Sequence, residues 1–176
     1  MFNKYFFNFN TMKNIILALL VMTIMVGCSN SNENAENNIA LIEKYIQAVE
    51  DLDFTAMETV LSDDYVGLGP SINDSIGKRD AVDNWKQNVE NLYESISYNR
   101  SRVLAITITS GDNQDDWISN WAELNIVYKA DKKSVTIWAN TVYQIENNKI
   151  VKSYTFYNEA DVLEQLGYVF INPNDL

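Results

Sequence analysis

The sequence predicts an α+β fold, in which N-terminal helices cover one face of a mainly antiparallel sheet. Hydrophobic residues recur at helical spacing from residue 39 to residue 93. From residue 103 to residue 157 the hydrophobic period changes to two, and β-branched residues become frequent. The connections between these later segments are short, which favours antiparallel pairing of neighbouring strands. Helices followed by a meander of strands is the order typical of α+β domains.

Three helices are expected before the sheet. The first begins at about residue 39, where an isoleucine-rich stripe starts, and it ends near Leu52. Asp53 is placed to cap a second, short helix that ends at Asp63 and Asp64. Residues 67–77 are rich in Gly, Pro, Ser, Asn and Asp and are therefore predicted to be a loop. A third helix is expected over residues 78–93.

The later segments predict four strands and a terminal helix. The strands are expected at 103–108, 117–128, 134–145 and 150–157, and the helix at 160–166. In the strand at 117–128 both faces carry bulky side chains, so alternation alone does not tell which face meets the core.

Composition excludes several classes of function. The chain has 176 residues, enough for one domain with a full core, and it contains no histidine and a single cysteine. Imidazole-dependent triads, histidine-ligated metals, cysteine zinc clusters and intrachain disulfides are therefore excluded. The formal net charge of −11 argues against nucleic acid as a partner. We expect no cofactor and no metal, because no glycine-rich phosphate loop or calcium-loop spacing is present.

The N-terminus has the pattern of a bacterial secretion signal. Met12 and Lys13 precede an uncharged run over residues 15–26, which is shorter than the 20 or so residues that span a bilayer. The sequence Met25-Val26-Gly27-Cys28 resembles a bacterial lipoprotein signal, which implies cleavage before Cys28 and its acylation, palmitate included. Alternatives are a transmembrane anchor and an ordinary cleaved signal.

The lipoprotein-signal interpretation divides the chain into three parts. Residues 1–27 are the signal peptide, of which residues 1–11 lie upstream of a second candidate start at Met12. Residues 28–38 are the lipidated cysteine and a polar, flexible tether, and residues 39–176 are the globular domain. The expected location is the bacterial cell envelope, with the lipid as the membrane contact and the outer membrane preferred.

The globular part resembles the nuclear transport factor 2 superfamily, and within it the SnoaL-like domains. The resemblance spans residues 39–167 and rests on four local patterns in the expected order of elements. These patterns are Gly77-Lys78-Arg79-Asp80-Ala81-Val82, the strand with Trp117 and Trp121, Asn148-Lys149-Ile150-Val151, and Glu164-Gln165-Leu166-Gly167. The resemblance implies a cone-shaped fold, in which a strongly curved sheet wraps over the helices and a pocket opens between them. The superfamily includes isomerases, cyclases and dehydratases, and also non-enzymatic binding and dimerisation modules.

The resemblance also indicates where chemistry would reside. SnoaL-like cyclases carry an acidic residue near the end of the last strand, often helped by a histidine on the preceding strand. Asn158 and Asn140 stand at these positions here. An amide cannot act as a general base at neutral pH, so we lean towards a domain that is not an enzyme.

Several residues remain candidates for the site. Glu123 shares a strand face with Trp117 and Trp121 and is the one weak catalytic candidate. The alternative, which we favour, is that it lies at the sheet edge or pairs with a lysine. The predicted ligand-binding residues are aromatic or carry an amide: Trp85, Trp121, Trp138, Asn140, Tyr154 and Asn158. The alternative for the aromatic residues is a core and a dimer interface.

Three functions are consistent with these observations. The first is a membrane-anchored domain that binds a small apolar or amphipathic ligand, or a protein partner, without catalysis. The second is an enzyme of isomerase, cyclase or hydratase type that uses Glu123 or another carboxylate, with a hydroxyl such as that of Tyr154 as donor. The third is a structural module for homodimerisation, and sheet-face dimers in the superfamily favour a homodimer in general.

Overall fold

The computed structural model describes the backbone of residues 29–175 and the side chains of residues 33–174. The predicted signal peptide and Cys28 lie outside the described residues. By its internal contacts the chain divides into Met1–Asn37 and Asn38–Leu176, and the domain described below is the second unit. This unit contains the whole sheet and both hydrophobic core clusters, so it has the core that a domain needs to fold independently.

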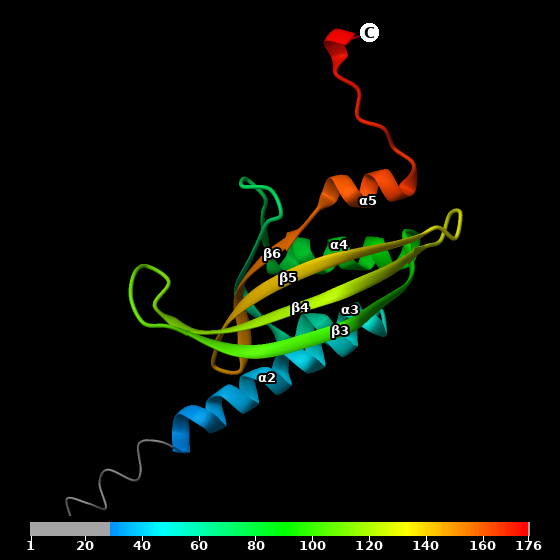
Figure 1. Ribbon diagram of the computed structural model, residues 1–176. Coiled ribbons are helices and arrows are strands. Elements are labelled where there is room, and N and C mark those ends of the chain that lie inside the picture. The colour runs from blue at the N-terminus through cyan, green and yellow to red at the C-terminus, as the bar shows by residue number, and fades with distance from the viewer. Residues whose placement is uncertain (1–28, 176) are drawn as a thin grey trace, which may run out of the picture. The chain divides into compact units, whose positions relative to one another are not determined.

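The elements follow the order that the sequence predicts, with additional strands. The helices are α2 (Ser29–Glu50), α3 (Phe54–Val60), α4 (Lys78–Asn91) and α5 (Glu159–Leu166), followed by a short 3-10 turn at Pro173–Asp175. The strands are β1 (Leu61–Leu68), β2 (Ser75–Gly77), β3 (Tyr93–Ile108), β4 (Asp115–Tyr128), β5 (Ser134–Glu146) and β6 (Lys149–Tyr157). Figure 1 shows this arrangement.

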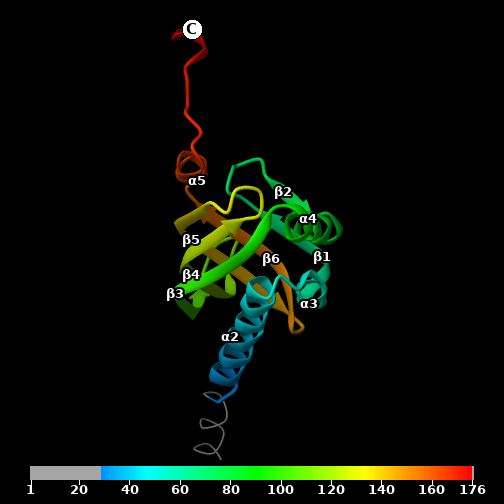
Figure 2. The same cartoon turned by 90° about the vertical axis from the view of Figure 1, so that its right-hand side faces the viewer.

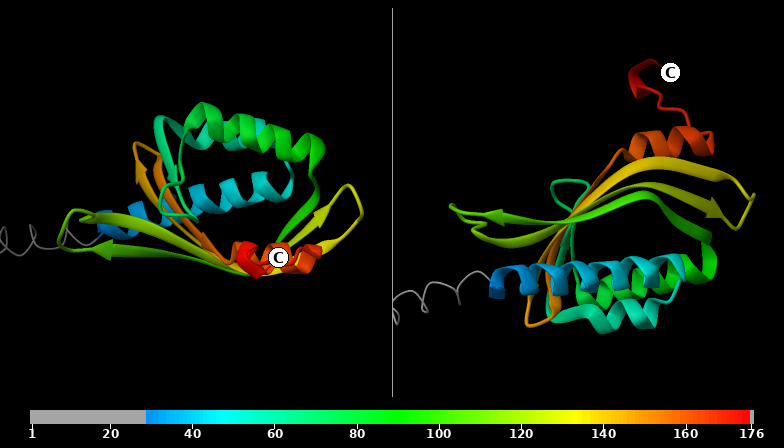
Figure 3. Two further views of the ribbon diagram at one scale, coloured as in Figure 1. Left: turned by 90° about the horizontal axis from the view of Figure 1, so that it is seen from above. Right: turned by 60° about the horizontal axis from the view of Figure 1, so that its bottom comes forward.

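One curved, unclosed sheet organises the domain. Its strand order is β2-β1-β6-β5-β4-β3. The meander from β3 to β6 is antiparallel, as predicted, whereas β1 pairs parallel with β6. Figure 3 shows that α2 (from Asn38 onward), α3 and α4 lie on the concave side of the sheet and that α5 lies on its other side. The α+β prediction is therefore confirmed.

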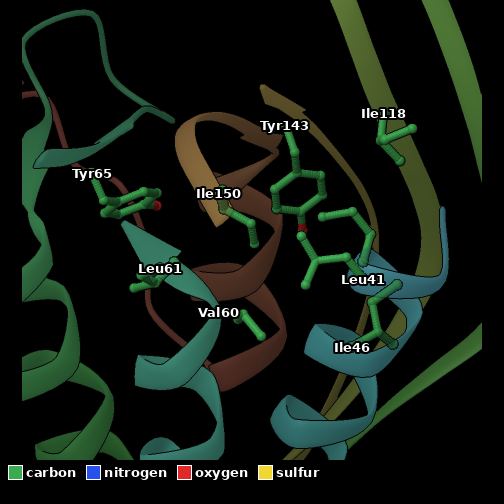
Figure 4. Close-up of a cluster of buried hydrophobic side chains, with 9 residues drawn as sticks. Leu41, Ile46, Val60, Leu61, Tyr65, Ile118, Tyr143 and Ile150 are labelled. Carbon is green, nitrogen blue, oxygen red and sulfur yellow. The ribbon is translucent and has the colours of Figure 1, made fainter. Parts of the chain in front are cut away.

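The core lies between the helices and the concave face. One cluster joins α2 to the sheet through Leu41, Ile42, Ile118, Tyr143 and Ile150, and Ile42 and Ile150 are fully buried. Figure 4 shows these strand side chains facing the helical residues. A second cluster packs Val49 and Met57 against Ile96 and Ile126. Burial of large aliphatic side chains on this scale is the main source of the domain's stability.

Local sequence explains where the short helices begin. Asp53 caps α3 as predicted, because its Oδ1 accepts a hydrogen bond from the Ala56 amide at 2.9 Å. Asn158 caps α5 in the same way, accepting from the Asp161 amide at 3.2 Å. α4 packs against both α3 and β1 (Figure 2).

Three lysines from other parts of the fold bind the C-terminal ends of three helices. Lys129 donates to the carbonyls of Val89 and Glu90 at the end of α4, at 2.6 and 3.0 Å. Lys133 donates to the Leu166 carbonyl at the end of α5, at 2.6 Å. Lys149 donates to the Thr59 carbonyl in α3. None of these helices has a basic residue in its own last turn, so the lysines supply the charge that favours a helix C-terminus.

Helix α5 covers the edge of β5 beyond the point where its pairing with β6 ends. β6 ends opposite Ala139, which leaves the backbone of Thr136 without a strand partner on that side. The side-chain amide of Gln165 replaces the strand: its Oε1 accepts from the Thr136 amide at 2.9 Å, and its Nε2 donates to the Thr136 carbonyl at 3.0 Å. The open strand edge is thereby satisfied locally.

The structure places the end of β1 and the short strand β2 within residues 67–77, which the sequence predicts as a loop. It departs from the sequence prediction in three further places. Helix α2 begins at Ser29 and so includes residues that the sequence predicts as a tether. Residues 61–68 form β1 rather than a helix end, with Asp63 and Asp64 exposed on it and an irregularity in its pairing with β6. β3 begins at Tyr93, ten residues before the predicted strand. Within residues 29–175, no helix combines the length and apolar character needed to cross a membrane.

Candidate functional site

A cavity of about 410 Å³ lies between the helices and the concave face of the sheet. This is within the size range of pockets that hold small organic ligands. Helices α2 and α4, the Gly69-Pro70 segment and all six strands contribute to its walls, and Val162 of α5 also lines it. Gly69 has a φ of +92°, and a Cβ at this position would overlap the Thr155 carbonyl oxygen, so glycine is required where this loop meets β6.

The register of the sheet places a polar row across the cavity floor. Asn120 of β4 lies opposite Thr141 of β5, and Thr141 lies opposite Thr155 of β6. All three line the cavity, and the two threonine hydroxyls lie 3.2 Å apart. The neighbouring pair on β4 and β5 is Ala122 and Ala139, whose small side chains leave room above the sheet.

Among the described residues, the aromatic lining consists of seven tyrosines and one tryptophan: Tyr45, Tyr65, Tyr93, Tyr98, Tyr128, Tyr143, Tyr157 and Trp85. The Tyr65 hydroxyl is hydrogen-bonded to Ser153 Oγ at 2.7 Å. The rings of Tyr45 and Tyr143 meet edge to face, with 6.0 Å between centroids. These side chains give the cavity flat apolar walls with hydroxyl groups at defined points.

Burial keeps these hydroxyls protonated. It raises the pKa of Tyr45 and of Tyr143 well above the ordinary value of 10, and it raises the pKa of Tyr93 to about 12. The pKa of Tyr98 rises for the same reason, and the neighbouring Tyr45 and Glu50 add to the effect. At neutral pH each of these phenols is therefore an uncharged hydrogen-bond donor and acceptor.

The cavity lining has no charged side chain among the residues that the structure describes. It consists of aromatic, aliphatic, hydroxyl and amide side chains, with Asn84 and Asn88 of α4 and Asn120 of β4 as the amides. The described walls therefore contain no carboxylate or amine that could take a proton from a bound carbonyl compound at neutral pH. The arrangement is suited to binding through shape and hydrogen bonds.

The structure brings one predicted ligand-binding residue into the cavity and places five elsewhere. Trp85 of α4 lines the cavity. Trp121, Trp138 and Asn140 point to the outer face of the sheet, because their immediate neighbours Asn120, Ala139 and Thr141 point inwards and side chains alternate along a strand. The same alternation places Tyr154 on the outer face, where its ring lies 6.0 Å from that of Trp117.

The two asparagines at the positions of the cyclase residues have structural partners. Asn140 donates to Ser119 Oγ at 2.9 Å and to the Asn120 carbonyl at 3.0 Å. Asn158 serves as the cap of α5. Neither is among the residues that line the cavity.

Glu123, the weak catalytic candidate, also lies on the outer face. Its carboxylate is 3.4 Å from the Arg100 guanidinium, which in turn lies 6.0 Å from the centroid of the Trp138 ring. The partner is thus an arginine rather than the lysine of the alternative interpretation. This geometry separates Glu123 from the cavity by the thickness of the sheet.

The residues that sequence reasoning missed are the polar row and the Tyr65–Ser153 pair. Alternation along β4 and β5 shows that Asn120 and Thr141 share a face with every second residue, but it does not show which face is inward. Both faces of β4 carry bulky side chains, so the sequence did not settle this choice. The small pair Ala122 and Ala139 is the signal that could have identified the inward face, because small side chains on a sheet leave space above it.

The comparisons with known proteins agree on the fold. The family model described as the SnoaL-like domain matches residues 39–148, which is more than half of the chain. A comparison with curated proteins gives no match. A candidate polyketide cyclase from Xanthomonas campestris pv. campestris is similar in structure, with a TM-score of 0.63, 12% identity, and coverage of 76% of this chain and 99% of that chain.

Two further solved structures show how varied the names of such relatives are. An epoxide hydrolase from M. tuberculosis, described as LEH-like, has a TM-score of 0.57 and 13% identity and covers 76% of this chain and 86% of that chain. A candidate isomerase from Bacillus subtilis has a TM-score of 0.58 and 15% identity, with 78% and 97% coverage. At these identities the similarity establishes the fold alone. Together with the family-model match, it shows that the chain belongs to the SnoaL-like domain family.

Proposed function

We propose that the domain binds a small, uncharged, amphipathic molecule in the cavity between its helices and its sheet, and that it does not transform this molecule. The observation that carries the proposal is the composition of the described cavity walls, which are aromatic and polar but uncharged. A buried ion would lose its hydration there without gaining a partner of opposite charge. A neutral ring compound would gain apolar contact with the tyrosines and hydrogen bonds from their hydroxyls.

Calorimetric titration of the domain, residues 33–176, tests this proposal with three probes of similar size at pH 7. We expect 2-naphthol to bind and 2-naphthoate to bind at least tenfold more weakly, because the carboxylate would be buried without a cation. The third probe is 2-naphthyltrimethylammonium. If this cation binds most tightly, the tyrosine rings act as a cage for cations and the proposed ligand class is incorrect.

An enzymatic function is the alternative that the names of the structural neighbours support, since they include cyclase, isomerase and epoxide hydrolase. Removal of a proton beside a carbonyl would be the first step of an isomerase or cyclase. Incubation of 2-tetralone with the domain in heavy water, followed by NMR, measures that step as loss of the α-proton signal. We expect exchange at the rate of buffer alone, and a faster rate that saturates with ketone would support the enzyme.

Membrane anchoring through Cys28 is a separate proposal that rests on the lipoprotein-like signal sequence. Several acyl chains on one cysteine would hold the chain on a membrane of the cell envelope. Growth of expressing cells with a fatty-acid analogue should label the full-length protein. Labelling of the Cys28→Ala variant at the level of the parent would exclude this anchor.

Homodimerisation is a further proposal, supported by the outer aromatic patch, which we define as Trp121, Trp138 and Phe156. Their exposed fractions are 46%, 58% and 54%. Asn140 lies opposite both Trp121 and Phe156, so the rings surround one amide on adjacent strands. Half-exposed rings of this size offer roughly 300 Å² together, a substantial part of the ~800 Å² per partner of a standard interface. Light scattering should give a dimer mass for the domain, and a monomer for Trp138→Ser.

A further inference from the structure

The amide of Asn120 is held in one orientation by its neighbours. Asn120 is 3% exposed, and its Nδ2 donates to Ser101 Oγ at 2.8 Å and to the Arg102 carbonyl at 3.3 Å. A carbonyl oxygen can only accept, so the NH₂ group must face β3. The side-chain oxygen Oδ1 therefore points away from β3.

Asn120 is one of the residues that line the cavity, and its Oδ1 has no hydrogen-bond partner among the described residues. Both hydrogens of the NH₂ group are already used by Ser101 and Arg102. Within the described part of the chain, every fully buried side-chain nitrogen or oxygen has a hydrogen-bond partner. Oδ1 must therefore reach accessible space, and the accessible space beside this nearly buried residue is the cavity.

We infer that Asn120 Oδ1 is a specificity-determining acceptor, and that the ligand is a hydroxylated ring compound which donates its hydroxyl hydrogen to this oxygen. The inference rests on the proposed function. A ligand without a donor would fill the space in front of Oδ1 and bury it unpaired, which is costly. The hydroxyl oxygen of such a ligand could in turn accept from Thr141, which lies opposite Asn120 in the sheet.

The ring requirement follows from the surroundings of the polar row. Beside the polar row the floor is apolar: Ala139 lines the cavity, and Ala122 lies opposite it in the sheet. The next pair along the two strands is Leu124 and Ile137, and both line the cavity. The buried tyrosines supply flat walls above this floor. A molecule with one polar end at Asn120 and a fused-ring body over the alanines would thus match the distribution of polar and apolar surface.

Calorimetry with two matched probes tests the inference on the domain at pH 7. 2-Naphthol carries the donor, whereas 2-methoxynaphthalene keeps the rings and the oxygen but cannot donate. We expect 2-naphthol to bind about tenfold more tightly. The Asn120→Leu variant should bind 2-naphthol and 2-methoxynaphthalene with about equal affinity. In the control Ser101→Ala the preference for 2-naphthol should persist, because Arg102 still orients the amide.

The outcomes distinguish failure of the proposed binding function from failure of the proposed role of Asn120. If neither probe binds the parent protein, the proposed function fails. If both bind with equal affinity, the cavity is a binding site but the role of Asn120 is incorrect. Affinity for 2-methoxynaphthalene reports whether Asn120→Leu keeps the cavity intact. The comparison of the two probes on the parent protein remains decisive even if that variant does not fold.

Discussion

The free energy of unfolding should fall steeply when the pH is raised above about 10. Tyr45, Tyr93, Tyr98 and Tyr143 all have raised pKa values because burial disfavours the phenolate. Above pH 10 the unfolded chain releases protons that the folded chain retains. The folded state then binds more protons than the unfolded state, and stability decreases as pH rises.

The expected size of this effect is large because several groups act together. Each buried tyrosine that stays protonated while its unfolded counterpart ionises contributes a slope of about 1.4 kcal/mol per pH unit. Below pH 10 these groups contribute no pH dependence, since both states are protonated. Urea denaturation at pH 8, 9, 10 and 11 measures the slope. A stability that stays constant from pH 9 to pH 11 would show that the tyrosines ionise freely in the folded protein.

Ala139→Phe should abolish binding of 2-naphthol, with a loss in affinity of at least 100-fold. Ala139 lies on the inward face of β5 in the cavity lining, and Ala122 lies opposite it on β4. A phenyl ring at this position would occupy the space that we assign to the rings of the ligand. A 100-fold loss corresponds to about 2.7 kcal/mol of binding free energy. Calorimetric titration measures it directly.

The control for this variant is Ala105→Phe. Ala105 is exposed on β3 and is not among the lining residues, so the same change there should leave affinity unaltered. Thermal unfolding of both variants checks that folding is preserved, and extra volume in an open cavity should cost less than the 1–3 kcal/mol or so of overpacking in a filled core. Unchanged binding in Ala139→Phe would place the ligand outside this cavity.

The helices and the antiparallel meander follow from local sequence, whereas β1 and half of β3 do not. Helical spacing and the Asp53 cap are properties of neighbouring residues, and they predicted closely where α3 and α4 begin. β1 contains Asp63, Asp64 and Gly67, which are poor strand residues by local propensity. It is a strand because β6, more than 80 residues later, supplies its hydrogen-bond partners. Such long-range pairing leaves little local signal.

The site was harder to predict than the fold, for a related reason. Family resemblance directed attention to Asn140 and Asn158, but strand parity and helix capping determine where these side chains lie. The residues that line the cavity include Asn120 and Thr141. Each is the immediate neighbour of a residue that the sequence predicted for the site, Trp121 on β4 and Asn140 on β5. Because a shift of one residue moves a side chain to the opposite face, a small uncertainty in register exchanges cavity and surface.

The lysine contacts at the helix ends have a practical consequence for anyone who labels this protein. Dyes and surface linkers are commonly attached by acylating lysine amines, which converts a charged donor into a neutral amide. Lys129, Lys133 and Lys149 each hold the end of a different helix, so such chemistry would weaken α4, α5 and α3 together. Probes for binding studies are therefore better attached through a cysteine introduced at an exposed site such as Ile72, in the loop between β1 and β2.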